Sequence, residues 1–157
     1  MFEIGSKIVH PMHGAGIIRE IEDKKILGEV KKYYILELPS GDMNVMIPVE
    51  SQQSVGIRTI VDKSVILEAI EVLKQESSHM DSNWNRRHRD NMEKIKKGDI
   101  LEVAGVVRNL MRVNRVKSLS AGEAKMLSNA KQILVSEIVL SCDISVEEAI
   151  KIVEDAV

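Results

Sequence analysis

Aromatic residues, cysteine and long apolar runs are all scarce in this 157-residue sequence, and each shortage excludes a class of protein. One Trp, two Tyr and one Phe leave a core that must be built from Ile, Val, Leu and Met. The single cysteine, Cys142, cannot form an internal disulfide, which is typical of a reducing compartment. No apolar run approaches the roughly 18 residues of a membrane span, and residues 1–10 lack signal-peptide features. We expect a cytoplasmic protein with no membrane contact.

Charge is unevenly distributed along the chain, although the net charge is only −2. Residues 84–131 carry 12 basic and 5 acidic side chains, a local charge of +7. Residues 132–157 carry 1 basic and 6 acidic side chains, a local charge of −5. The small net charge argues against general affinity for nucleic acid, but a local positive field still binds phosphates and releases counterions. The basic stretch is therefore a candidate nucleic-acid face.

The first 60 residues have the pattern of short β-strands. Strands are predicted at 8–9, 17–21, 33–38 and 43–47, with a glycine-rich bend at 13–16 and turns at 23–25 and 39–42. Short strands at this spacing favour a small antiparallel barrel. We place this domain at residues 1–58.

From about residue 62 the spacing of apolar residues becomes helical, and about five helices are predicted. The first of them has a predicted apolar stripe that consists of Val65, Leu67, Ala69, Ile70 and Leu73. Candidate N-caps, in chain order, are Asp62 or Ser64, Asp81 or Ser82, Asp99, Ser120 and Ser145. Glutamate follows both Ser120 and Ser145 three residues later, which is the pattern of a capping box. Gly98 is suited to end the second helix. The predicted fold class is therefore α+β, with an antiparallel β-barrel followed by a helical bundle at 63–157.

Residues suited to catalysis or metal binding are few. His10 and His13 are three apart, but no cysteine or further histidine is near enough to complete a metal site. Cys142 has Asp143 beside it and no evident base partner, which favours a structural thiol. No phosphate-binding GxxxxGK[ST] run is present. We expect no enzymatic activity, metal, cofactor or small-molecule substrate; a hydrolase that uses His10 or His13 is the alternative.

The only tryptophan, Trp84, is followed by three arginines, Arg86, Arg87 and Arg89. An indole has a large flat apolar surface, and a guanidinium group matches the geometry of phosphate. Together they suit a group that meets the edge of stacked bases while its neighbours bind the backbone. The alternative is that Trp84 is a core residue and the arginines form a solvated helix face.

More basic residues follow in the same half of the chain. Arg108, Arg112 and Arg115 have the i, i+4, i+7 spacing of one helix face. Lys117 precedes the start of the next predicted helix, and a helix N-terminus is itself a natural phosphate site. Each charge alone is explained by solubility, but together they extend the candidate nucleic-acid face.

Several motifs resemble those of a known family. The helical half contains Trp84-x-Arg86-Arg87-x-x-x-Asn91, Lys97-Gly98-Asp99, Val106-Val107-Arg108-x-Leu110 and Leu119-Ser120-x-x-Glu123-x-x-Met126-Leu127. In these motifs the chain resembles the CarD/CdnL family of bacterial transcription regulators. The N-terminal half contains Gly5-x-x-Ile8-Val9-His10-Pro11-x-His13-Gly14-x-Gly16. This run resembles the RNA-polymerase-interacting domain that the family shares with transcription-repair coupling factor.

The resemblance implies a function. The N-terminal module would be a Tudor-like β-barrel that binds the RNA polymerase β subunit, and the helices would contact promoter DNA in the minor groove near the −10 element. Trp84 would be a wedge that holds the melted DNA and lengthens the life of the open complex. The implied DNA contacts are Trp84, Arg86, Arg87, Arg89, Arg112, Lys117 and Lys125. The implied polymerase contacts are Lys24, Tyr34, Val45, Met46 and Ile47. Family members have arginine at or near the positions of Lys24 and Met46, so the apolar Met46 departs from the pattern.

A second function is open from the residues alone. A protein adaptor with no DNA contact would bury Trp84 in its core and turn the basic face toward an acidic partner. Exposure of the indole separates the two hypotheses, because only the wedge requires it. For the transcription regulator we expect a monomer that is associated with the nucleoid through RNA polymerase.

Overall fold

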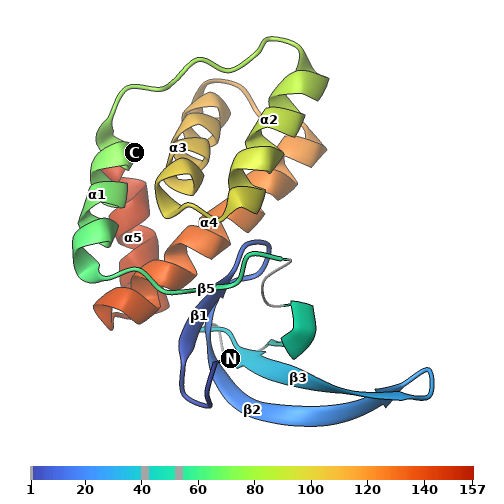
Figure 1. Cartoon of the computed structure of the whole chain (residues 1–157). Helices are drawn as coiled ribbons and strands as arrows, with labels where there is room; N and C mark the ends of the chain where they lie inside the picture. The colour runs from blue at the N-terminus through green and yellow to red at the C-terminus, as the bar shows by residue number, and fades with distance from the viewer. Residues whose placement is uncertain (1, 40–42, 52–54) are drawn as a thin grey trace.

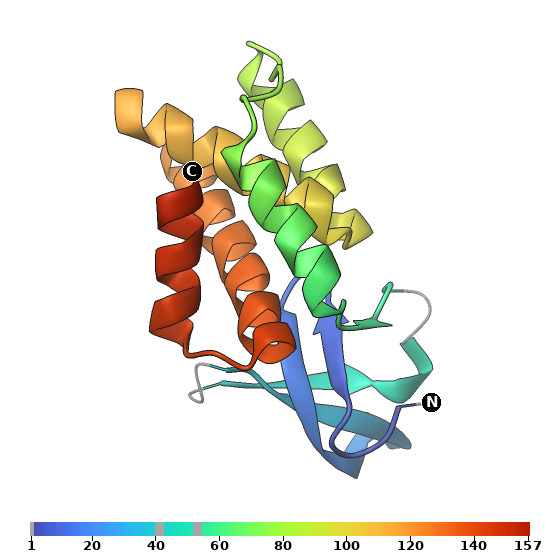
Figure 2. The same cartoon turned by 90° about the vertical axis from the view of Figure 1, so that its left-hand side faces the viewer.

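The computed structural model describes residues 2–39, 43–51 and 55–157. Within these ranges an antiparallel sheet is followed by five helices, so the predicted α+β class is confirmed. The sheet lies against one side of the helical bundle, and the helix at residues 84–97 extends away from the sheet (Figures 1 and 2).

The sheet has the strand order β4-β3-β2-β1-β5, and every neighbouring pair is antiparallel. Its strands are β1 (Lys7–His10), β2 (Gly14–Ile26), β3 (Glu29–Glu37), β4 (Asn44–Pro48) and β5 (Arg58–Thr59), with a short 3₁₀ turn η1 (Val49–Ser51) after β4. Alternation along β3 and β4 places Tyr34, Leu36 and Ile47 on the inner face, where they pack with Ile8 and Ile18. The sheet domain therefore has its own small core.

The β2–β3 hairpin is longer than the sequence predicts. The turn expected at 23–25 is wrong, because these residues lie in β2 and pair with 30–32 of β3. The chain turns instead at Leu27 and Gly28, whose φ angles are 53° and 82°. Two consecutive positive φ angles are the signature of a type I′ turn, whose twist matches that of the strands. Of the turn expected at 39–42, residues 40–42 lie outside the described part of the chain.

The helices begin and end close to the predicted signals. They are α1 (Lys63–Lys74), α2 (Trp84–Lys97), α3 (Ile100–Val116), α4 (Ala121–Cys142) and α5 (Val146–Ala156). The N-caps Asp62, Asp99, Ser120 and Ser145 are confirmed, as is Gly98, which has a left-handed φ of 76°. The predicted N-cap of α2, Asp81 or Ser82, is wrong. The N-cap is Asn83, whose side chain accepts the Arg86 N–H at 3.1 Å.

The core of the bundle is aliphatic and lies between the five helices, with α2 contributing the fully buried Ile95. On α1 the buried stripe is Ile66, Ala69 and Leu73, the i, i+3, i+7 spacing of one helix face. Leu67, which the sequence pattern places in this stripe, is exposed instead. The predicted stripe is therefore wrong at Leu67, because the buried residue at this level of the helix is Ile66.

Polar contacts join the sheet to the middle of α4. The Arg58 guanidinium donates to both carboxylate oxygens of Glu137, at 2.7 and 2.8 Å. The Ser136 hydroxyl accepts the Ala15 N–H at 2.8 Å, and a Cβ on Gly14 would lie 2.6 Å from the same oxygen. Such a close approach is possible only because residue 14 is glycine. The two halves of the chain are thus held in one relative orientation.

Candidate nucleic-acid interface

Trp84 is the first residue of α2, and its side chain lies outside the core clusters. The residue is 41% exposed, and the indole Nε1–H donates to the Ser120 hydroxyl at 3.1 Å. The His88 ring, one turn later in α2, stacks on the indole with centroids 4.9 Å apart and an interplanar angle of 17°. The hypothesis that Trp84 is a core residue is therefore wrong, and the indole has a defined orientation at the surface.

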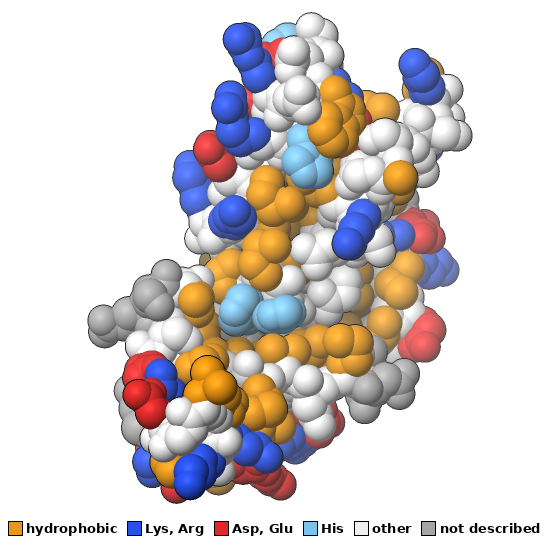
Figure 3. Space-filling view, turned by 90° about the vertical axis from the view of Figure 1, so that its right-hand side faces the viewer, with side chains coloured by type: hydrophobic (Ala, Val, Ile, Leu, Met, Phe, Trp, Pro, Cys, Tyr) orange, Lys and Arg blue, Asp and Glu red, His pale blue; other side chains and the backbone are white. Residues whose placement is uncertain are grey.

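Hydrophobic and histidine side chains form a band along one face of the molecule, from the helices to the sheet (Figure 3). Lys and Arg side chains gather beside the helical end of this band (Figure 3). This arrangement combines apolar and cationic groups on one surface. Such a combination is suited to a nucleic acid, which presents bases and phosphates together.

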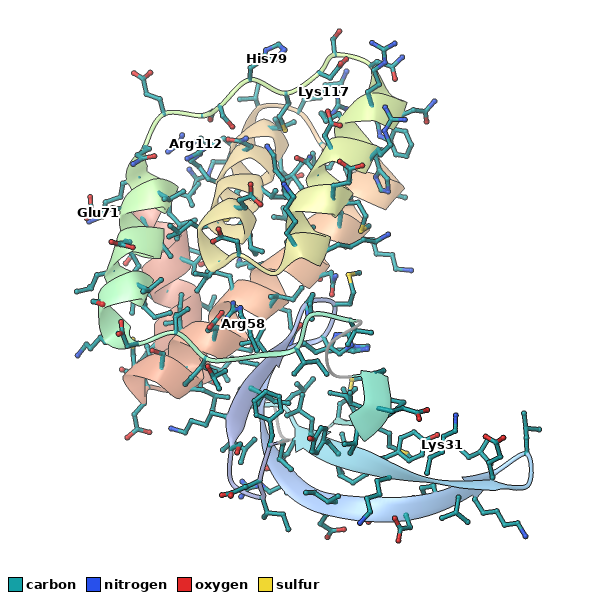
Figure 4. All side chains as sticks on the ribbon, viewed as in Figure 1. Lys31, Arg58, Glu71, His79, Arg112 and Lys117 are labelled. Carbon is teal, nitrogen blue, oxygen red and sulfur yellow. The ribbon has the colours of Figure 1, made fainter. Side chains whose placement is uncertain are left out.

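Four of the predicted DNA-contacting cations are exposed: Arg86 and Arg89 on α2, Lys117 at the end of α3, and Lys125 in α4. In the part of the chain that the structure describes, no side chain or carbonyl pairs with any of them. Lys117 lies at the upper end of the bundle in Figure 4, where α3 stops. These four charges are available to a ligand.

Arg87 is held by protein groups. Its guanidinium donates to the two carboxylate oxygens of the buried Glu123 at 3.1 and 2.7 Å and to the Asp81 carbonyl at 3.1 Å. The hydrogen bonds that Arg87 donates to Glu123 raise the pKa of Arg87 more than the negative charge of Glu123 does. Sequence reasoning assigned Glu123 to a capping box, but its carboxylate binds Arg87 and so joins α2 to α4. Arg87 is therefore placed to position the start of α2.

Arg112 and Arg108 hold the segment that connects α1 to α2. Arg112 donates to the carbonyls of Gln75 at 2.6 Å and Leu73 at 3.2 Å, and lies between α1 and α3 (Figure 4). Arg108, expected on the same exposed basic face, is buried and donates to the Val72 carbonyl at 2.8 Å. Burial, followed by the charge of Arg112, lowers the pKa of Arg108. The spacing that predicted a shared helix face did not reveal these acceptors.

Comparison with known proteins accounts for both halves of the chain. A model of the CarD C-terminal domain matches residues 68–154, and a model of the CarD-like/TRCF RID domain matches residues 2–61. The chain belongs to the CarD family. It is similar to "Putative transcription factor YdeB" of Bacillus subtilis (strain 168), with 43% identity over 138 residues that cover 88% of this chain and 90% of the relative. The resemblance read from the sequence motifs is confirmed, and this CarD-family chain is a transcription regulator.

In the sheet domain of this CarD-family chain, two of the residues predicted to contact polymerase, Tyr34 and Ile47, are buried. The side chains of Tyr34 and Ile47 are buried in the sheet core, and the Tyr34 hydroxyl accepts the Phe2 N–H at 3.0 Å. Period-two alternation puts them opposite each other on the inner face. Lys24 and Met46 are exposed, and Lys24 pairs with Glu22 at 3.1 Å. Val45 is half-buried.

His10 and His13 of this CarD-family chain have a structural role. Their rings are in tilted contact, with centroids 4.5 Å apart and an interplanar angle of 50°, and Nδ1 of His10 accepts the Met12 N–H at 3.0 Å. Burial, and then the nearby His13, lowers the pKa of His10. In the described ranges no three His, Cys, Asp or Glu side chains are placed to hold a metal ion. The helices among the described residues are all too short or too polar to cross a membrane.

Proposed function

We propose that this protein binds RNA polymerase through its sheet domain and stabilises melted promoter DNA through Trp84. The observation that carries the proposal is the oriented, part-exposed indole beside unpaired cations. The DNA contact lies in the minor groove at the upstream edge of the melted −10 region, and the polymerase contact is with the β subunit.

An indole at this position favours melted DNA because its apolar face replaces the stacking that a base loses when the duplex opens. Exposed cations bind the neighbouring phosphates and set the register of the contact. A preference of about 2–3 kcal/mol for melted over closed DNA would lengthen the open-complex lifetime about 30- to 150-fold.

The direct DNA contacts are Trp84, Arg86, Arg89, Lys117 and Lys125. Arg87 and Arg112 support this surface indirectly, since their donors bind protein groups in the absence of DNA. Replacing either of them would disturb the connection between helices as well as remove a charge. Their variants are therefore poor tests of phosphate binding.

The polymerase contact uses the outer edge of β4 together with exposed side chains of the sheet. Among the described residues β4 is the terminal strand of the sheet, so its outer backbone groups are free to pair with a strand of a partner. Lys24 and Met46 supply side chains from β2 and β4, with Val45 half-buried next to Met46. Met46 makes this contact partly apolar.

The test is the lifetime of open complexes formed by RNA polymerase on one promoter, with and without the protein. Trp84→Ala should shorten the lifetime to near that of polymerase alone while leaving polymerase binding unchanged. Arg86→Ala and Arg89→Ala should shorten it less and make it more sensitive to salt. Lys151→Ala, an exposed lysine on α5, is the matched control. An unchanged lifetime with Trp84→Ala would favour the adaptor hypothesis.

A further inference from the structure

The indole of Trp84 is fixed by groups from two helices. Ser120, the N-cap of α4, accepts the Trp84 Nε1–H at 3.1 Å and the Glu123 N–H at 3.3 Å with the same hydroxyl oxygen. A hydroxyl has two acceptor lone pairs, so one oxygen can receive both bonds. The residue that starts α4 thus also sets the direction of the indole N–H.

His88 covers one face of the indole. The two residues are four apart on α2, and the near-parallel rings are in stacking contact. Nδ1 of His88 is buried, and among the described residues it has no hydrogen-bond partner. An unsatisfied buried nitrogen destabilises the fold.

Gly122 lies against the edge of the six-membered ring. A Cβ at this residue would be 3.1 Å from Cζ2 and 3.6 Å from Cη2 of Trp84. Alanine would therefore displace the ring by a few tenths of an ångström. The ion pair between Arg87 and Glu123, at 2.7 Å, fixes the first turns of α2 and α4 relative to each other. Together these contacts leave the indole little freedom to rotate.

We propose that Ser120, His88 and Gly122 are positioning residues that hold the indole in one orientation, so that a single face is offered to one unstacked base. This inference rests on the proposed function. Its physical basis is preorganisation: an indole that is already ordered loses less conformational freedom when the base binds. A freely rotating indole with the same exposed area would stabilise melted DNA less.

Ser120→Ala is the sharpest test, because Ser145→Ala is a matched control. Both serines cap a helix by accepting the N–H of a glutamate three residues later, at 3.3 and 3.1 Å, but only Ser120 also bonds the indole. The two variants should lose similar stability. Ser120→Ala alone should shorten the open-complex lifetime, by about three- to tenfold, and Ser120→Thr should restore it.

Trp84 fluorescence reports the same property without DNA, because it is the only tryptophan. Time-resolved anisotropy should show faster indole motion in Ser120→Ala and His88→Ala than in the wild type. His88→Phe keeps a stacked ring and should retain both the slow motion and the lifetime. Gly122→Ala should change the emission and the lifetime of the open complex.

The outcomes separate the two proposals. If Trp84→Ala shortens the open-complex lifetime but Ser120→Ala matches Ser145→Ala, the wedge stands and the positioning role is overturned. If the indole is as rigid in Ser120→Ala and His88→Ala as in the wild type, the positioning role is overturned whatever Trp84→Ala does. If Trp84→Ala has no effect while the variants loosen the indole, the positioning is real but the proposed function is wrong.

Discussion

Removal of the Arg58 guanidinium should destabilise the fold more than removal of its partner carboxylate on Glu137. The Glu137 side chain is 1% exposed and accepts bonds from Arg58 at 2.7 and 2.8 Å and from the Val61 N–H at 2.9 Å. Arg58→Ala leaves this carboxylate buried with one donor, and stranding a buried charge costs about 3–5 kcal/mol.

The opposite variant leaves a charge that water can reach. The Arg58 side chain is 29% exposed and also donates to the carbonyl oxygens of Gly98 and Thr59, at 3.0 and 3.1 Å. After Glu137→Ala the guanidinium keeps these bonds, so we expect a smaller loss of about 2 kcal/mol. The double variant strands neither charge and should cost less than the sum of the two single changes, by about 1 kcal/mol or more.

Urea unfolding followed by far-UV circular dichroism measures these free energies. The control is Lys131→Ala, which breaks the exposed pair with Glu154 at 2.9 Å and should cost less than about 1 kcal/mol. The reasoning is refuted if Arg58→Ala costs no more than Glu137→Ala, or if both cost as little as the control.

Three further predictions concern single residues. Gly14→Ala puts a Cβ, at φ +95°, 2.6 Å from the Ser136 Oγ and should lower the free energy of unfolding in urea by about 2–4 kcal/mol. The control is Gly28→Ala, at φ +82° in open space, which should lower it by only about 1 kcal/mol. Equal losses of stability in the two variants would contradict this prediction. Leu27→Asn suits a fully exposed left-handed position and should raise Tm by about 2–4 °C in a thermal melt, whereas a lower Tm would refute the turn assignment. The pKa of His10 lies below its ordinary 6.5, so the unfolded chain binds this proton more tightly than the fold does. Stability should therefore decrease as the pH falls below about 6.5, and His10→Gln should weaken that decrease in urea titrations at several pH values; equal pH dependence would argue against the shift.

Local signals were readable from the sequence, and long-range partners were not. Ser120 and Ser145 could be identified as caps because a cap depends on residues within one turn. The destination of the Glu123 carboxylate could not, because its partner Arg87 is 36 positions away in the chain. The acceptors of Arg112 could not be predicted either, because they lie at the end of α1, far from Arg112 in the sequence. Whether an arginine is free for phosphate therefore depends on tertiary contacts.

Two errors in the sheet have different origins. The buried positions of Tyr34 and Ile47 could have been inferred, since alternation places Tyr34 on the same face as Leu36. The turn at Leu27 could not be inferred in this way, because both faces of the projecting hairpin are solvated and the alternation of apolar and polar residues is lost there. The exposure of Trp84 was indicated by the family resemblance and not by composition, which favours a buried tryptophan.

The 22-residue helix α4 touches the indole at its N-terminal turn and the sheet at Ser136 and Glu137. Each residue of an α-helix adds about 1.5 Å of length and about 100° of rotation. Insertion or deletion of one residue between Ser120 and Ser136 would therefore swing the indole by more than a quarter turn about the helix axis relative to the sheet. Homologues should therefore keep the length of this interval fixed even where its exposed side chains vary, and gaps in their alignments should fall in the segment between α1 and α2 instead.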